Sequence, residues 1–135
     1  MKRRNFIVLS ALTAATVSVP FLSCTSPNPE LDKKLAVPQI LSQLLDEPTI
    51  RAIGKAFPTV NADEYSIKKL ENLLAKNIAG EPVSANTPAK DIYAILEHKI
   101  RDDFESGNTL VLNGWVLSLT EARQCALFSL ISTRN

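Results

Sequence analysis

Apolar side chains recur every three or four residues along most of the chain, which is the spacing of one face of an α-helix. The pattern predicts helices over about 37–46, 47–57, 61–79, 88–105 and 119–132. The most regular of them is expected to start at Asn61 and to place on one face Ile67, Leu70, Leu74 and Ile78. The sequence therefore predicts a mainly α fold, a small domain of about five helices.

In two of these helices, single residues predict how the helix packs against its neighbours. Gly54 lies inside 47–57, and a glycine weakens a helix interior, so it predicts a point where another backbone comes close. Phe104 ends the apolar stripe of 88–105 and is expected to be buried with the rest of that stripe. Both residues thus predict packing inside the domain.

The helical periodicity is interrupted after Gly107, which is placed to supply the left-handed residue that ends a helix. Two apolar runs follow, Thr109–Leu112 and Trp115–Leu117, with Asn113-Gly114 between them. Both positions of a type I′ turn need a positive φ, which Asn and Gly tolerate best. The sequence therefore predicts one short β-hairpin before the last helix.

The last predicted helix begins with Ser118-Leu119-Thr120-Glu121, the pattern of a capping box, in which the hydroxyl and the carboxylate each accept a backbone N–H. The helix is apolar almost all the way round, and such a helix is buried on several sides. Two interpretations stay open: it is the central helix of the core, or it presents one side to a partner.

The first 23 residues predict an export signal rather than a part of the fold. Lys2-Arg3-Arg4-Asn5-Phe6-Ile7 resembles the twin-arginine motif, with Arg3, Arg4 and Phe6 as the recognition residues. The apolar run that follows, 7–22, is shorter than the ~20 residues that a membrane-spanning helix needs. An ordinary secretory signal is the alternative.

Cys24 follows Phe21-Leu22-Ser23, which resembles a lipoprotein cleavage box and makes Cys24 a candidate lipidation site. A plain thiol is the alternative. Residues 24–36 are mostly polar and predict a flexible tether. The remaining residues, 37–135, are predicted to form a single helical domain.

Charge and composition exclude several kinds of chemistry. After residue 23 the chain carries 12 basic and 14 acidic side chains, which disfavours nucleic acid as a partner. There is one His and no CxxC, HExxH, P-loop or GxGxxG pattern, so no catalytic set, cofactor site or metal site is expected. Cys125 lies in an apolar run and is expected to be a small buried side chain rather than a reactive thiol.

The stretch 102–130 contains the run DF-x-x-G and then NGW-x-LS-x-TEAR-x-CAL. This run resembles the small subunit of membrane-associated, FAD-dependent sugar and polyol dehydrogenases, which include sorbitol, gluconate, glucose and fructose dehydrogenases. The residues that carry the resemblance are Asp103, Phe104, Gly107, Gly114, Trp115, Leu117, Ser118, Thr120, Glu121, Ala122, Arg123, Cys125, Ala126 and Leu127.

The resemblance implies a periplasmic, non-catalytic subunit that assists the folding and the twin-arginine export or membrane attachment of a large catalytic subunit. It implies that FAD belongs to that large subunit and that this chain binds no cofactor. A cytochrome c subunit is a further candidate partner. Two other functions stay open: a free-standing periplasmic lipoprotein that acts as a structural or ligand-binding module, and, ranked last, a small enzyme.

Within the resemblance, the hairpin and the helix after it are predicted to contact the large subunit. The candidate interface residues are Trp115, Leu117, Glu121, Arg123 and Phe128. Structural alternatives exist, since Trp115 can fill the core, Glu121 can cap a helix and Arg123 can be a charge on a helix surface.

Overall fold

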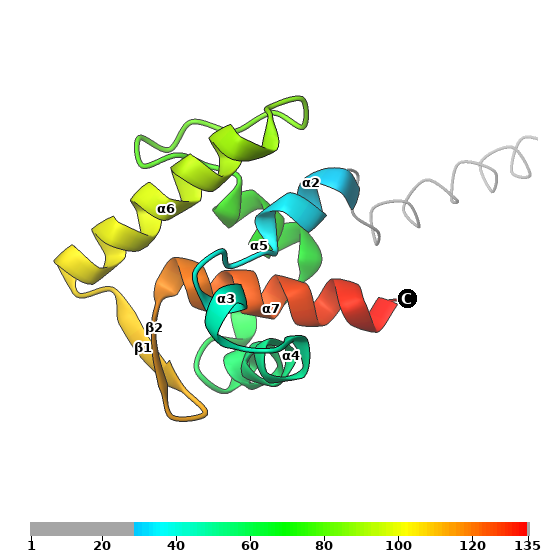
Figure 1. Ribbon diagram of the computed structural model, residues 1–135, viewed down its shortest axis with the longest axis vertical. Coiled ribbons are helices and arrows are strands. Elements are labelled where there is room, and N and C mark those ends of the chain that lie inside the picture. The colour runs from blue at the N-terminus through cyan, green and yellow to red at the C-terminus, as the bar shows by residue number, and fades with distance from the viewer. Residues whose placement is uncertain (1–28, 135) are drawn as a thin grey trace, which may run out of the picture.

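The computed structural model describes residues 29–134, so the candidate export and lipidation residues Arg3, Arg4, Phe6 and Cys24 lie outside the described range. The described residues form six α-helices, two short 3-10 helices and one β-hairpin (Figure 1). The elements are α2 (Pro29–Leu35), α3 (Leu41–Leu44), α4 (Glu47–Ala56), η1 (Phe57–Thr59), η2 (Ala62–Glu64), α5 (Ile67–Leu74), α6 (Ala89–Ser106), β1 (Thr109–Leu112), β2 (Trp115–Ser118) and α7 (Leu119–Arg134). The predicted mainly α fold with one hairpin before the last helix is confirmed.

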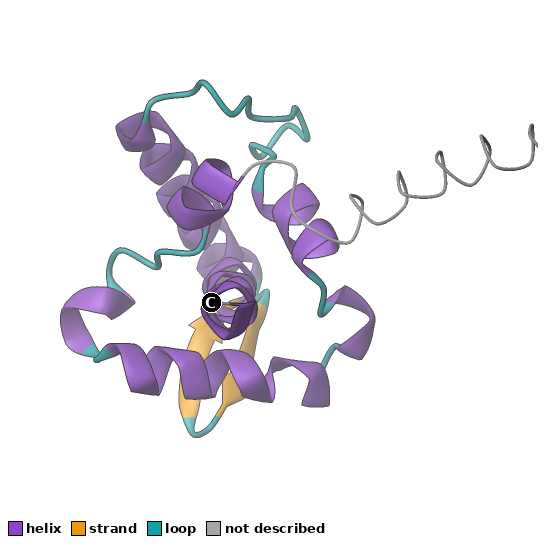
Figure 2. Cartoon of the chain, turned by 90° about the vertical axis from the view of Figure 1, so that its right-hand side faces the viewer, coloured by secondary structure: helices purple, strands orange, loops and turns teal. Residues whose placement is uncertain are grey.

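The last helix, α7, is the central element of the fold. Figure 2 looks nearly along its axis and shows the other helices arranged around it, with the hairpin near its beginning. Side chains on every side of α7 are almost completely buried: Ala122, Gln124, Cys125, Ala126, Leu127 and Ser129. Of the two interpretations of this apolar helix, the structure supports the central core helix.

Helix α4 crosses α7 at Gly54, and there the two backbones are in direct contact. A Cβ atom on Gly54 would overlap the carbonyl oxygen of Cys125 and would lie 2.6 Å from its carbonyl carbon. A glycine is therefore required for the observed spacing of the two helices, as the position of Gly54 in the sequence predicts.

The prediction of a flexible tether over 24–36 is wrong for the part that the structure describes. Residues 29–35 form α2, and its apolar side chains Leu31 and Leu35 are buried in the core together with Ala36. The polar residues of this segment suggested a tether, but α6 and α7 supply an apolar surface on which α2 packs. The helical domain therefore includes residues 29–36.

Two predicted helices are shorter than expected. Of 37–46, only α3 is helical. The 61–79 segment contains η2 and then α5, which starts after Ser66, because the Ser66 hydroxyl accepts the Lys69 N–H at 3.2 Å. Helix α5 ends at Leu74, where the ammonium group of Lys99 from α6 donates to the carbonyls of residues 73 and 74, at 2.9 and 3.3 Å. Ile78 is consequently exposed, contrary to prediction.

The hairpin has the predicted turn. Asn113 and Gly114 have φ angles of 52° and 83°, and Gly107 ends α6 with a φ of 81°. Cross-strand neighbours lie on the same face of a hairpin. The pairs Leu110–Leu117 and Leu112–Trp115 therefore share the face toward α7, and Val111 and Val116 lie on the opposite face.

Candidate functional site

The hairpin is held against α6 and α7 by the predicted capping box. The Glu121 N–H donates to the Ser118 hydroxyl at 2.9 Å, and the Ser118 N–H donates to the Glu121 carboxylate at 3.1 Å. The Thr120 N–H donates to the Asp103 carboxylate of α6 at 2.7 Å. The side chains of Asp103, Ser118 and Glu121 are all buried. These three polar residues of the family-like motif, the 102–130 stretch that carries the resemblance, therefore fix the hairpin in place.

Two of the predicted interface residues are buried within the chain itself. Leu117 is 1% exposed, on the inner face of the hairpin, and Glu121 is 5% exposed, in the capping box. The prediction that they contact a partner is therefore wrong for this fold. The structural alternative is correct for Glu121, because its carboxylate caps α7.

Arg123 is also engaged inside the molecule. Its guanidinium group donates two hydrogen bonds to the Glu64 carboxylate, at 2.8 and 2.9 Å, and its side chain is 17% exposed. These hydrogen bonds are the main reason why the pKa of Glu64 lies below its ordinary value. Arg123 thus ties α7 to the segment before α5, and it is neither a surface charge nor a free contact residue.

Phe128 lies five residues further along α7 and is half-buried. The guanidinium group of Arg51 lies 5.7 Å from the centre of its ring. Phe128 lines a pocket with Pro38 and Ile50, and this pocket shares no residue with the groove beside the hairpin. Phe128 therefore does not line the same groove as Val116 of the hairpin.

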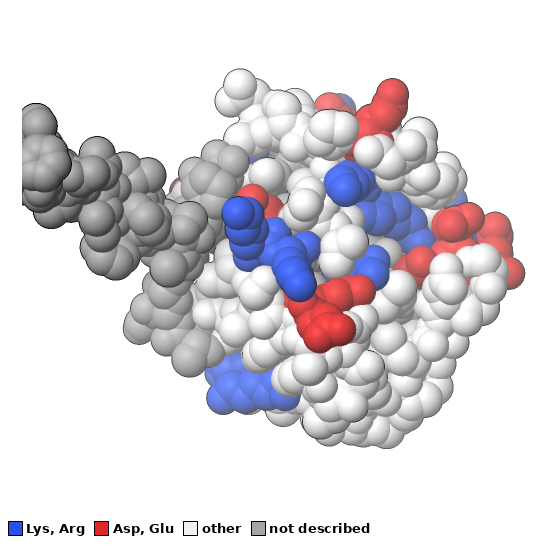
Figure 3. All heavy atoms as spheres, turned by 180° about the vertical axis from the view of Figure 1, so that it is seen from behind, with Lys and Arg blue, Asp and Glu red and all other residues white. Residues whose placement is uncertain are grey.

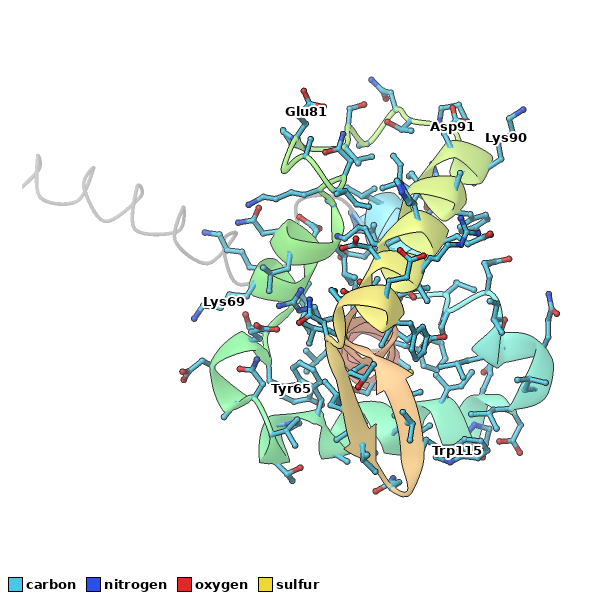
Figure 4. All side chains as sticks on the ribbon, turned by 90° about the vertical axis from the view of Figure 1, so that its left-hand side faces the viewer. Tyr65, Lys69, Glu81, Lys90, Asp91 and Trp115 are labelled. Carbon is cyan, nitrogen blue, oxygen red and sulfur yellow. The ribbon has the colours of Figure 1, made fainter. Side chains whose placement is uncertain are left out.

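Trp115 is the one predicted interface residue with substantial exposure, at 41%. Figure 4 places it at the side of the hairpin, next to the segment that runs from α3 to α4. A side chain with this exposure does not fill the core. Trp115 therefore stays available for contact with another molecule.

Four other large apolar side chains lie exposed on the hairpin and on the elements beside it. Val111 and Val116 form the outer face of the hairpin, and Val116 is 63% exposed. Val116, Phe104 of α6 and Ile40, just before α3, line one groove of about 380 Å³. We call these four residues, together with Trp115 on the other face of the hairpin, the hairpin surface: Ile40, Phe104, Val111, Trp115 and Val116. The prediction that Phe104 is buried is wrong, because α6 extends past the core at its last turn.

The hairpin surface carries almost no charge. The sequence contains no Asp, Glu, Lys or Arg from Gly107 to Thr120. Figure 3 shows the molecule from behind, where basic and acidic side chains gather near the centre and a wide area at the lower right carries no charged side chain. Three charged residues line the groove. Glu97 and Arg101 pair with each other at 3.1 Å, and the buried carboxylate of Glu121 accepts the Ser118 N–H. The surface therefore suits an apolar partner.

Cys125 is completely buried in α7, and burial raises the pKa of its thiol to about 12. A thiol with this pKa is protonated at neutral pH and is a poor nucleophile, so the predicted role as a small buried side chain is confirmed. In the described part of the chain, no three His, Cys, Asp or Glu residues are grouped as metal ligands. None of the helices within 29–134 combines the length and the hydropathy that crossing a membrane requires.

The chain matches no protein-family model, no curated protein and no solved structure with which it was compared. The resemblance of the 102–130 stretch to dehydrogenase small subunits therefore rests on its residues alone.

Proposed function

We propose that this chain is a non-catalytic small subunit that binds the catalytic subunit of an FAD-dependent sugar or polyol dehydrogenase. In this proposal it assists the folding and the twin-arginine export or membrane attachment of that subunit. The observation that carries the proposal is the hairpin surface, where the exposed side chains of Ile40, Phe104 and Val116 line one groove beside a stretch, 107–120, that contains no charged residue. Contiguous exposed apolar groups are uncommon on monomers and tend to mark interfaces.

The arrangement divides the family-like motif into two roles. Its buried polar residues, Asp103, Ser118 and Glu121, hold the hairpin rigidly on α6 and α7. Trp115 and Phe104, which belong to the same motif, are exposed on the hairpin surface. A rigid support lowers the entropic cost of binding, because the contact residues are already in place. The proposed contact is therefore the hairpin and its groove, and not the buried helix α7.

The identity of the partner comes from the sequence resemblance. It supports a large subunit that carries FAD, with a cytochrome c subunit as a further candidate, and a periplasmic location. In the proposal, Arg3, Arg4 and Phe6 direct twin-arginine export and Cys24 carries the lipid. An export route that carries folded proteins suits a signal-bearing subunit that brings a cofactor enzyme with it.

Substitution of the outer face of the hairpin tests the proposal. Full burial of a valine contributes about 1.5–3 kcal/mol, so Val116→Lys is expected to weaken capture of the partner by at least tenfold. Val60→Lys is the matched control, because Val60 is an exposed valine outside the hairpin surface. Both variants should keep the thermal stability of the native chain, since neither side chain is in the core.

The assay is affinity purification of each tagged variant from membranes, with flavin absorbance as the readout and the captured chain identified by mass spectrometry. We expect flavin to co-purify with the native chain and with Val60→Lys, and to be lost with Val116→Lys. Equal flavin recovery from both variants would exclude the hairpin surface. A captured partner without flavin would exclude the dehydrogenase assignment.

A free-standing periplasmic lipoprotein with a ligand-binding role is the second candidate. The observation that favours it is a polar cleft between α5, α6 and the beginning of α7. The same purification distinguishes the two functions, because a free-standing protein is recovered alone.

A further inference from the structure

A cleft of about 260 Å³ lies away from the hairpin surface, where the end of α5 and the turn after it face α6 and the start of α7. Most of the residues that line it are polar or charged, among them Lys76, Asn77, Lys99, Asp102, Asp103 and Arg123. No residue of the hairpin surface is among them. The cleft is therefore a separate candidate site, and a role for it does not depend on the proposed function.

Lys99 is the central group of this cleft. Its side chain is partly buried, and its ammonium group donates to the carbonyl oxygens of Leu73 and Leu74, at 2.9 and 3.3 Å. An ammonium group has three hydrogens in a tetrahedral arrangement, so these two carbonyls leave one N–H for a further acceptor. Because Lys99 also lines the cleft, a bound molecule can supply that acceptor.

The cleft holds more positive than negative charge. Burial is the main cause that lowers the pKa of Lys99 to about 8, and the positive charges of Arg123 and Lys76 lower it further. Asp103 opposes this effect, but its carboxylate is already committed to the Thr120 N–H, at 2.7 Å. The three cations therefore repel one another, and a bound anion would relieve that repulsion.

The charge of the lining indicates the kind of anion. Its three cations are Lys76, Lys99 and Arg123, and its two carboxylates are Asp102 and Asp103, which leaves a net charge of one positive unit. Arg123 also pairs with Glu64 and is thereby partly neutralised. A dianion would exceed the available positive charge and would face the two carboxylates, whereas a single carboxylate balances the site. The volume is below that of pockets for drug-sized ligands.

We propose that this cleft binds a small monocarboxylic acid, whose carboxylate accepts hydrogen bonds from the ammonium groups of Lys99 and Lys76. Asp102, at the exposed edge of the cleft, accepts a hydrogen bond from a hydroxyl group of the same ligand. The fitting class is therefore a short hydroxy acid. Bound ligand joins α5 to α6 through the two lysines and stabilises their contact.

Titration of the full-length chain with sodium lactate tests this assignment, with sodium chloride at equal ionic strength as the reference. The lysine ammonium signals are followed by NMR. We expect lactate to shift the Lys99 signal in a saturable way and to raise the pKa of Lys99, because the anion favours the charged form. Lys76→Ala should weaken lactate binding about tenfold, the effect of losing one charge-assisted hydrogen bond.

Lys90→Ala is the matched control, since Lys90 is an exposed lysine at the beginning of α6, far from the cleft (Figure 4). It should leave lactate binding unchanged. Lys99→Met should abolish lactate binding. If this variant also destabilises α5, because Lys99 donates to the carbonyls at the end of α5, the result with Lys76→Ala still tests the site. Equal responses to lactate and chloride, or equal affinities of the two alanine variants, would overturn the site. Tighter binding of sulfate than of lactate would overturn the monocarboxylate assignment.

Discussion

Gly54→Ala offers a direct test of the contact around which the core is built. Helices α4 and α7 touch through their backbones at this position, and the added methyl group would overlap the carbonyl oxygen of Cys125. The carbonyl carbon, at 2.6 Å, would have to retreat by close to an ångström to reach ordinary van der Waals distance. The obstacle is helix backbone, which cannot move aside as a flexible side chain can.

The expected magnitude follows from two opposing effects. Overpacking a well-packed core costs about 1–3 kcal/mol, and a clash with backbone belongs at or above the upper end of that range. Alanine favours the helix over glycine by about 1 kcal/mol, which offsets part of the loss. We therefore expect Gly54→Ala to lower the free energy of unfolding by about 2 kcal/mol and the melting temperature by about 8 °C or more.

Urea unfolding followed by circular dichroism at 222 nm measures this loss. Lys55→Ala is the matched control, since Lys55 is the next residue on α4 and is exposed. It should change the free energy of unfolding by less than about 0.5 kcal/mol. Adding Ser129→Gly should not restore stability, because the Cys125 carbonyl stays in place. A Gly54→Ala chain as stable as the native one, or more stable, would refute the backbone contact.

Two further predictions concern the helix cap and export. Ser118→Ala removes the hydroxyl that accepts the Glu121 N–H, and should lower the free energy of unfolding by about 1 kcal/mol in the same urea assay. Ser42→Ala, at an exposed serine, should have little effect, and equal losses for both would argue against the capping box. Arg3→Lys combined with Arg4→Lys keeps the charge but loses the planar guanidinium groups, so the chain should stay in the cytoplasm on fractionation. Normal recovery of this double variant from the periplasm would rule out twin-arginine export.

Local signals in the sequence predicted several features of the structure correctly. Asn113-Gly114 predicted the hairpin turn, because only a few residues tolerate the positive φ angles that it needs. Ser118 and Glu121 predicted the start of α7, because a capping box is formed by residues three positions apart. The exposed pair Val111 and Val116 could also have been found in this way, since a two-residue turn fixes which residues face each other.

Other features depended on partners that are distant in the sequence. Asn61 and Ser66 are both acceptable caps, and the start of α5 was not decided by the local pattern. Phe104 continues the apolar stripe of α6, but the core ends before it, so it is exposed. Leu31 and Leu35 lie in a segment rich in polar residues and are nevertheless buried, because α6 and α7 face them.

The sequence by itself determined the helical fold class, the hairpin turn and the cap of the last helix, since these rest on the backbone preferences of neighbouring residues. Only the tertiary structure decided that Leu117, Glu121 and Arg123 are engaged inside the chain, while Trp115 remains exposed. It also brought Ile40, Phe104 and Val116 into one groove. Burial is a property of the surfaces that meet on folding, and residues far apart in the chain supply the two sides of each contact.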